Sequence, residues 1–200
     1  MNPTRFLVRK LDDFIRKSSQ VFEFSQDAEC LLRLQVTHAP RRILLPDMTV
    51  EPGEPVLLIH LWNERLPPVS PSGTDLAWAR CILRRWRRSL CLAAGYLQDN
   101  PQFNQVRAVG GVTILATSGL HEAGSHFFHD MGFMVIPSSN RLGRFGEFWE
   151  NFYSYLIIWT FNPASLPKRP LFRIRRSEMW MSRESFLQRY GEIRAMTPAE

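Results

Sequence analysis

Apolar residues recur at intervals of three and four in several segments of the chain, the spacing that gives a helix one apolar face. The first of these segments also carries basic residues between the apolar ones and predicts an amphipathic basic helix. Thr74 or Asp75 is the expected N-cap of a long helix, and Ser182 is the expected N-cap of the last one. The predicted helices cover residues 1–24, 75–98, 120–131, 144–161 and 183–190.

Runs of β-branched and large apolar residues between turn-forming residues predict strands. The first three runs are separated by turn-rich segments and are expected to start an antiparallel sheet. Gly110 and Gly111 lie inside a later apolar run and allow a bulge or a close backbone approach. The predicted strands cover residues 30–36, 41–45, 56–62, 106–116, 133–137, 171–175 and 178–181, the last two as a hairpin.

These elements predict an α+β fold with a mainly antiparallel sheet packed with three or four helices. We expect one domain over residues 25–191, preceded by the basic helix of residues 1–24 and followed by a flexible tail over residues 192–200. A length of 200 residues fits one domain. Hydrophobic residues at 44% and charged residues at 22% are close to globular averages and exclude a disordered chain.

For three of the predicted helices, the pattern does not decide what their apolar or charged faces contact. The basic helix of residues 1–24 can pack its apolar stripe on the core, or lie on a membrane surface that attracts it through anionic lipid. The helix of residues 75–98 carries an arc of four arginines opposite its apolar arc, and a solvated face explains that arc without a ligand. The aromatic helix of residues 144–161 is either buried in the core or lines a groove for a lipid or acyl chain.

Cys30, Cys81 and Cys91 have no paired spacing, so neither a disulfide framework nor a zinc knuckle is indicated. Their use fits a reducing cytoplasm. Residues 1–24 lack the long apolar run and the cleavage site of a signal peptide. No apolar run is long enough to cross a bilayer. We therefore expect a cytoplasmic protein, with peripheral association at the inner membrane face as an option.

The formal net charge is +6, and 22 of the 25 basic residues are arginine. The planar guanidinium suits phosphate and carboxylate groups, so an anionic or lipid-linked small molecule is a candidate partner. Nucleic acid is a poor candidate, because the aromatic residues fall at helical spacing rather than among basic residues on an exposed strand.

The densest cluster of titratable groups lies at residues 121–130. Its histidine spacing is not that of a zinc-protease helix. Glu122, His126 and His129 share one helical face, which is either a solvated face or a site for a divalent metal, and we predict no metal. His121 stands at the helix start, where the helix dipole disfavours its charged form. His121 is a candidate acid, base or hydrogen-bond donor, with a hydrogen-bonded structural role as the alternative, and Glu122 is a further candidate catalytic residue.

Two further segments carry polar groups in positions that suit a ligand. His60 interrupts an apolar strand on the face shared by Leu58 and Trp62, and it is either a catalytic acid or base or a buried histidine bonded to a backbone carbonyl. Asn63 and Arg65 follow it as candidate ligand-binding residues. A polar segment between a strand and a helix predicts an anion pocket, although it lacks the lysine and spacing of a P-loop. Its candidate residues are Ser138, Ser139, Asn140, Arg141 and Arg144.

The string I-H-L-x-N-x-R-L stands at Ile59–Leu66, and it is followed by Gly110–Leu115, Met131–Phe133 and Met179–Ser182. In this order, these segments resemble the YkoP-like domain of bacteria, and the string at Ile59–Leu66 is the most specific part of the resemblance. That family has no established activity, but similar domains occur beside polysaccharide deacetylases, which implies an envelope setting. This chain has no deacetylase segment of its own.

A second resemblance covers the strand at 112–116, the helix at 122–131 and the turn that follows, which are similar to the later half of GCN5-related N-acetyltransferases. The chain lacks the R/Q-x-x-G-x-G/A turn that holds pyrophosphate in those enzymes. This resemblance implies an acyltransferase-like enzyme with a coenzyme A or carrier-protein thioester donor, in which His121, Glu122 or His60 moves the proton.

Two functions follow from these observations. The first is a YkoP-like module that binds an anionic or lipid-linked envelope precursor, with residues 1–24 on the membrane surface. The alternative is the acyltransferase-like enzyme. The residues indicate no bound cofactor and leave open whether the protein is an enzyme.

Overall fold

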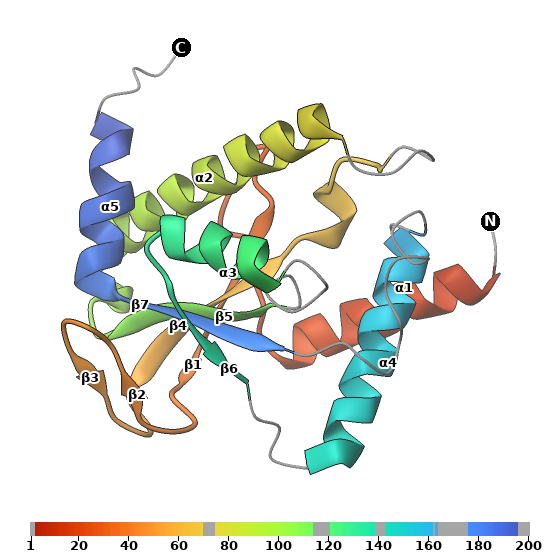
Figure 1. Cartoon of the computed structure of the whole chain (residues 1–200), viewed down its shortest axis with the longest axis horizontal. Coiled ribbons are helices and arrows are strands. Elements are labelled where there is room, and N and C mark those ends of the chain that lie inside the picture. Colours follow the sequence, from red (N-terminus) through yellow and green to blue (C-terminus); the bar gives the residue numbers. More distant parts are fainter. Residues whose placement is uncertain are drawn as a thin grey trace.

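The computed structural model describes residues 3–69, 75–113, 121–138, 143–161, 163 and 176–195. These residues have the predicted α+β fold (Figure 1). The helices are α1 (Pro3–Ser18), α2 (Leu76–Asp99), α3 (His121–Asp130), α4 (Gly143–Phe161) and α5 (Arg183–Ala195), with 3-10 helices η1 (Asn63–Arg65) and η2 (Pro101–Phe103). The strands are β1 (Leu32–His38), β2 (Ile43–Leu44), β3 (Thr49–Val50), β4 (Pro55–Leu61), β5 (Ala108–Thr113), β6 (Met134–Pro137) and β7 (Ser177–Ser182).

The main sheet has the strand order β1-β4-β5-β7-β6. Among the described strands, β4 and β5 are the one parallel pair, and α2 makes the long crossover that a parallel pair requires. β2 and β3 do not join this sheet, which differs from the expected three-strand start. They pair with each other, and Ile43 and Val50 are buried in a cluster with Trp180. Burial of these two side chains folds the β2–β3 hairpin onto one face of the sheet instead of extending it.

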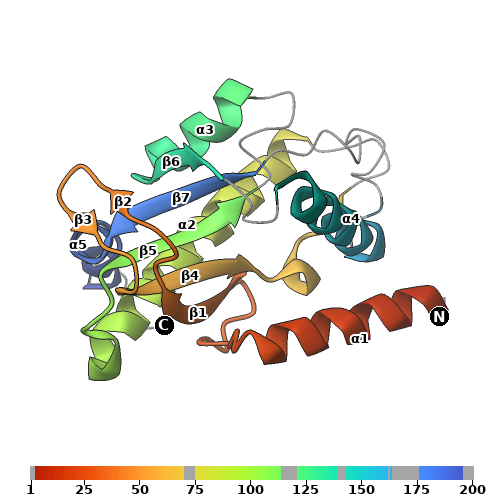
Figure 2. The ribbon, with the colours of Figure 1, turned by 90° about the horizontal axis from the view of Figure 1, so that it is seen from below.

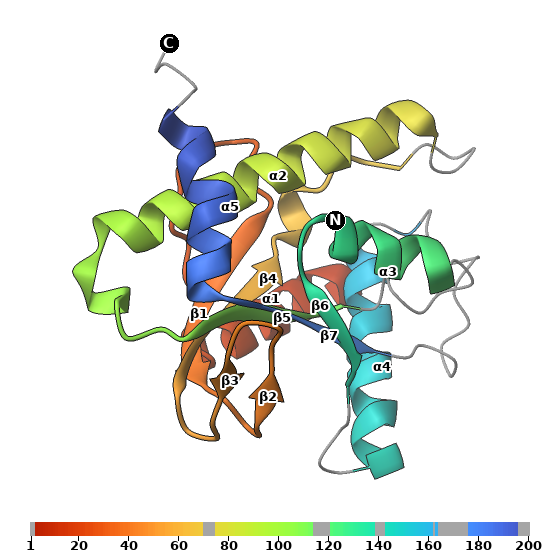
Figure 3. The same ribbon diagram turned by 60° about the vertical axis from the view of Figure 1, so that its left-hand side comes forward.

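The strands alternate between two faces of the sheet, because successive side chains point to opposite sides. On the first, which we call the core face, Leu34, Leu57, Val109 and Met179 lie in the main hydrophobic cluster. α2, α3 and α5 cover this face with large side chains (Figure 3). The buried ones include Trp86, Leu90, Leu97, Phe128, Phe186 and Tyr190.

The opposite face of the sheet, which we call the second face, has two different neighbours. The β2–β3 hairpin covers one end of it, and α1 and α4 lie beyond the other end of the strands, packed against each other (Figure 2). Trp180 packs on this face directly over Gly110, where an added Cβ would come within 2.2 Å of the indole ring. At Gly111 an added Cβ would come within 2.8 Å of the backbone oxygen of Ile59, so the expected close backbone approach is confirmed there, and Gly110 makes room for the tryptophan side chain.

The helix starts follow local signals. Asp75 accepts a hydrogen bond of 2.7 Å from the Trp78 amide, and Ser182 accepts one of 3.1 Å from the Ser185 amide, so both predicted N-caps are confirmed. α1 ends at Ser18, earlier than expected, and α5 continues to Ala195, beyond the expected start of the tail. β7 pairs with β5 and β6. Residues 171–175, its expected hairpin partner, lie outside the described residues.

The two faces of α2 are as predicted. Its apolar side packs in the core, and its arginines lie at the surface, with 68% of the Arg84 side chain and 54% of the Arg88 side chain exposed. These two side chains also form ion pairs with the loop before β1, Arg84 with Glu29 at 2.9 Å and Arg88 with Asp27 at 2.7 Å. The arginine face therefore holds a neighbouring loop in addition to facing solvent. The three cysteines are free thiols.

Candidate functional site

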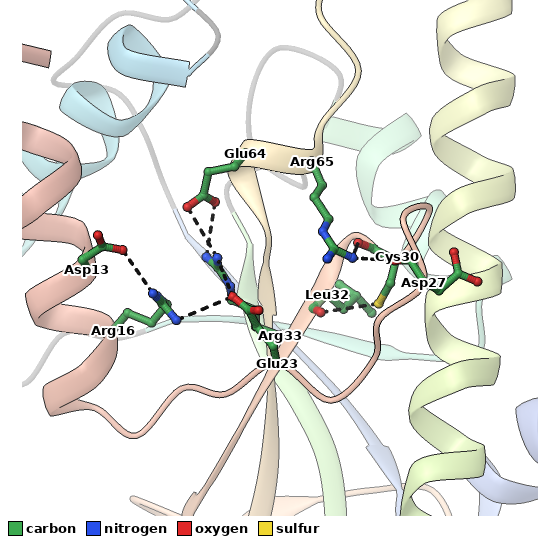
Figure 4. Close-up of polar contacts among 9 residues, drawn as sticks. All are labelled: Asp13, Arg16, Glu23, Asp27, Cys30, Leu32, Arg33, Glu64 and Arg65. Atoms are coloured by element: carbon green, nitrogen blue, oxygen red, sulfur yellow. Dashed lines mark hydrogen bonds and ion pairs between the residues drawn. The ribbon is translucent and has the colours of Figure 1, made fainter. Parts of the chain in front are cut away.

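The string at Ile59–Leu66 runs from β4 into η1, where two arginines contact Trp62. The Arg65 guanidinium lies 3.4 Å from the centre of the Trp62 ring and that of Arg33 lies 4.2 Å from it. Arg65 also donates hydrogen bonds to the carbonyl oxygens of Asp27 and Cys30 (Figure 4). Arg65 thus ties η1 to the loop before β1.

Arg33 is buried on the second face of the sheet and lies between two carboxylates. It donates to Glu64 at 3.2 Å and to Glu23 at 3.1 Å. Glu23 also lies 3.7 Å from Arg16 of α1, which bonds Asp13 at 3.1 Å (Figure 4). This chain of ion pairs joins α1 to β1 and η1. A buried arginine requires such partners, because an isolated buried charge is costly.

α1 is joined to α4 by a hydrogen bond between two half-buried side chains. The Tyr153 hydroxyl donates to Asp12 Oδ1 at 2.5 Å. Burial raises the pKa of the Asp12 carboxyl above its ordinary value, against the opposite effect of the Tyr153 hydrogen bond. Burial and the neighbouring Asp12 raise the pKa of Tyr153. Tyr153 therefore remains a hydroxyl donor at neutral pH.

His60 lies half-buried on the second face, on the side of the strand that sequence alternation predicts. Its ring nitrogen Nε2 is 2.8 Å from Oε1 of Gln35 on β1. The partner is therefore a side-chain amide and not the backbone carbonyl that we expected. Burial lowers the pKa of His60, which favours the neutral imidazole.

The apolar stripe of α1 faces outward. The exposed fractions are 68% for Leu7, 43% for Leu11 and 69% for Phe14, whereas Val8 is 5% exposed. At 3.6 residues per turn, the face with Val8 and Asp12 that contacts the body is about 120° around the helix from this stripe. The core-packing interpretation of α1 is therefore wrong for the centre of its stripe.

The aromatic face of α4 is also partly open. Phe148, Trp149 and Phe152 are 42%, 52% and 38% exposed, and their rings contact one another. Among the described residues, eight of the eleven large hydrophobic side chains that are exposed lie on α1 and α4. Both helices lie at the same end of the molecule (Figure 1). Contiguous exposed apolar patches are typical of protein–protein and membrane interaction sites.

A scan against protein families matches the YkoP domain over residues 4–190. The chain belongs to the YkoP domain family. No curated protein and no solved structure matches it. The second resemblance, to GCN5-related N-acetyltransferases, is not supported: the match that covers the chain is to the YkoP domain. None of the helices in the described part of this YkoP domain is long and apolar enough to span a bilayer.

Three of the predicted site residues lie close together where β4 leads into η1. His60, Asn63 and Arg65 lie at the end of β4 and in η1, beside the Arg33 network. Ser138 follows β6, which is three strands from β4, or roughly 14 Å at ordinary strand spacing. Its amide donates to the Arg176 carbonyl at 3.1 Å. The structure therefore does not bring His60 and Ser138 into contact.

The remaining predicted residues lie partly outside the described part of the chain. Ser139, Asn140 and Arg141 lie outside it altogether, and Arg144 is described only as a backbone position in α4. His121 and Glu122 begin α3, which packs on the core face, and their side chains are not described. Where side chains are described, no histidine, cysteine and carboxylate groups gather as a metal site would require. The roles given to these residues stay predictions.

Four residues that make contacts around β4, η1 and α1 were not among the predicted site residues: Asp12, Arg33, Gln35 and Tyr153. Arg33 had a signal, because a charged residue between Leu32 and Leu34 of an apolar strand must find partners if it is buried. The sequence signal for Asp12 is weaker: it is an acidic residue in a helix that is otherwise mostly basic. Gln35 and Tyr153 had none, because their partners are distant in sequence.

Proposed function

We propose that this YkoP domain binds the surface of membranes that carry anionic lipid, with α1 as the contacting helix. The observation that carries the proposal is the direction of the apolar stripe of α1. Leu7, Leu11 and Phe14 point away from the rest of the domain. A different side of α1, which carries Asp12, makes the contact with the domain. A helix in an aqueous protein normally turns its stripe toward the core.

Charge at the border of the stripe favours an anionic surface. Lys10 and Lys17 are exposed and lie about 90° around the helix from the stripe, on the side opposite the body. Basic residues near an anionic membrane surface contribute about 1 kcal/mol each. Each fully buried leucine or phenylalanine side chain adds about 1.5–3 kcal/mol. Together these terms suit a helix that lies in the interfacial plane of a bilayer.

A lipid-linked anionic precursor offers the same chemistry as a membrane lipid, namely acyl chains next to a charged headgroup. The envelope setting that the family resemblance implies would contain both. The proposal commits to the bilayer surface, because the exposed stripe follows the length of a helix and suits an extended surface better than a single chain.

Vesicle co-sedimentation tests the proposal. We expect the protein to sediment with phosphatidylcholine vesicles that contain phosphatidylglycerol. The variant Leu7→Asp/Phe14→Asp should bind at least tenfold more weakly, which corresponds to about 1.4 kcal/mol or more. The matched control is Leu44→Asp, because Leu44 is 65% exposed on the β2–β3 hairpin, away from α1. Equal binding by both variants would overturn the proposal.

A further inference from the structure

On the second face of the main sheet, a row of side chains lies between the β2–β3 hairpin and the α1–α4 end, and the centre of this row is exposed. Val112 lies on the central strand β5 and is 55% exposed. Its partner on β7 is Glu178, and the β4–β5 register, continued by two residues, places His60 on its other side. A mainly antiparallel sheet can present one face to solvent, and a ligand can reach side chains on that face. Here the row His60, Val112, Glu178 remains accessible at its centre.

Hydrogen bonding fixes the tautomer of His60. Oε1 of Gln35 can only accept, so Nε2 of the neutral imidazole carries the hydrogen and donates it. Nδ1 is then the acceptor, and it has no hydrogen-bond partner among the described residues. The Gln35 amide also has its NH₂ group on this face. Nδ1 of His60 is therefore an uncharged acceptor, and the NH₂ group of Gln35 beside the row is an uncharged donor.

The charged groups around this row are already neutralised within the protein. Arg33 is held by Glu64 and Glu23. Glu178 accepts from Arg41 and from the Trp180 indole nitrogen, each at 2.9 Å. An anion would find these cations occupied, and a cation would find these carboxylates occupied. The electrostatics of the row favour a ligand without charge.

We propose that the row His60, Val112, Glu178 binds an uncharged polyhydroxylated compound, such as a sugar ring, over Val112. One ligand hydroxyl donates to Nδ1 of His60 and a second accepts from the Gln35 amide. The C–H face of the ring covers the side chains of Val112 and Leu58, of which Leu58 is half-buried. This site is separate from the lipid-contacting stripe of α1 and does not depend on it.

Nuclear magnetic resonance titration of the full chain tests this site with neutral monosaccharides and disaccharides as probes. We expect saturable shifts of the Val112 methyl groups and of the His60 ring, and no such shifts with inorganic phosphate. His60→Ala should weaken binding about tenfold, in line with loss of one hydrogen bond and the packing around it. His38→Ala is the matched control, because His38 is exposed at the other end of β1.

Val112→Lys is the second variant, because an exposed position tolerates a polar side chain without unfolding the sheet. It should also abolish the sugar-induced shift of the His60 ring. Three results would overturn the proposal: no shift with any neutral sugar, a shift with phosphate at the same residues, or wild-type sugar affinity in both variants.

Discussion

At the scale of single residues, the contact between Asp12 and Tyr153 holds α1 in its orientation. Because burial raises the Asp12 pKa, the ionised carboxyl weakens the docking of α1. The stabilising contribution of the protonated carboxyl is present below its ordinary pKa of 3.8 and is lost as the pH rises through the raised value. Neutral pH is thus the condition at which Asp12 favours docking least.

The variant Asp12→Asn keeps an oxygen acceptor for Tyr153 and cannot ionise. At pH 7 we expect hydrogen exchange of the α1 amides to slow by about threefold relative to the wild type. The difference should disappear as the pH falls toward the ordinary pKa of the carboxyl. Asp13→Asn, which affects only a partly exposed pair with Arg16, should not slow exchange. Faster exchange in Asp12→Asn would contradict the assigned effect of burial.

Arg33 stabilises the corner where β1, η1 and α1 meet. Arg33→Ala removes its packing on Trp62 and leaves Glu64 and Glu23 without their cation. We expect a loss of about 3 kcal/mol in the free energy of unfolding, measured with urea. Arg84→Ala breaks an exposed pair of similar length and should cost less than about 1 kcal/mol. Similar losses in the two variants would show that burial of Arg33 is unimportant.

At the scale of elements, local signals predicted the helices better than their surroundings. The starts of α2 and α5 follow from Asp75 and Ser182, because a cap is a contact between residues three apart. The periodicity of α1 predicts an apolar stripe, but the direction of that stripe depends on Tyr153, which is 141 residues away from Asp12. The β2–β3 hairpin leaves the main sheet for a similar reason, since its burial depends on Trp180.

For the candidate site, the sequence predicts the face on which a residue lies but not its hydrogen-bond partner. Strand alternation correctly placed His60 on the face of Leu58 and Trp62. The partner Gln35 could not be predicted, because it requires the register of β1 against β4. The role of Arg65 in holding backbone carbonyls likewise depends on a loop more than 30 residues away.

The lysines of α1 should set the salt dependence of membrane binding. Lys10→Glu/Lys17→Glu is expected to weaken binding to phosphatidylglycerol vesicles at least tenfold and to flatten its dependence on salt. Binding is measured by co-sedimentation at two ionic strengths. Arg80→Glu, an exposed change on α2, is the control. If both variants lose the same affinity, net charge and not α1 governs binding.

At the scale of the whole molecule, the sheet separates two surfaces with different chemistry. The end with α1 and α4 carries most of the exposed apolar side chains among the described residues. The second face of the sheet carries the neutral polar pair His60 and Gln35. Four of the arginines in the described part of the chain, Arg33, Arg41, Arg84 and Arg88, each pair with a carboxylate. The net charge of +6 alone therefore does not locate a binding site.

The depth of α1 in a bilayer is the most direct test of the membrane proposal. Phe14→Trp and Leu44→Trp each add a tryptophan at an exposed apolar position, one on α1 and one on the β2–β3 hairpin. Vesicles with phosphatidylglycerol and brominated acyl chains quench tryptophan that enters the bilayer. We predict that the fluorescence added at position 14 is quenched and that the fluorescence added at position 44 is not. Quenching at position 44 alone, or at neither position, would contradict the account.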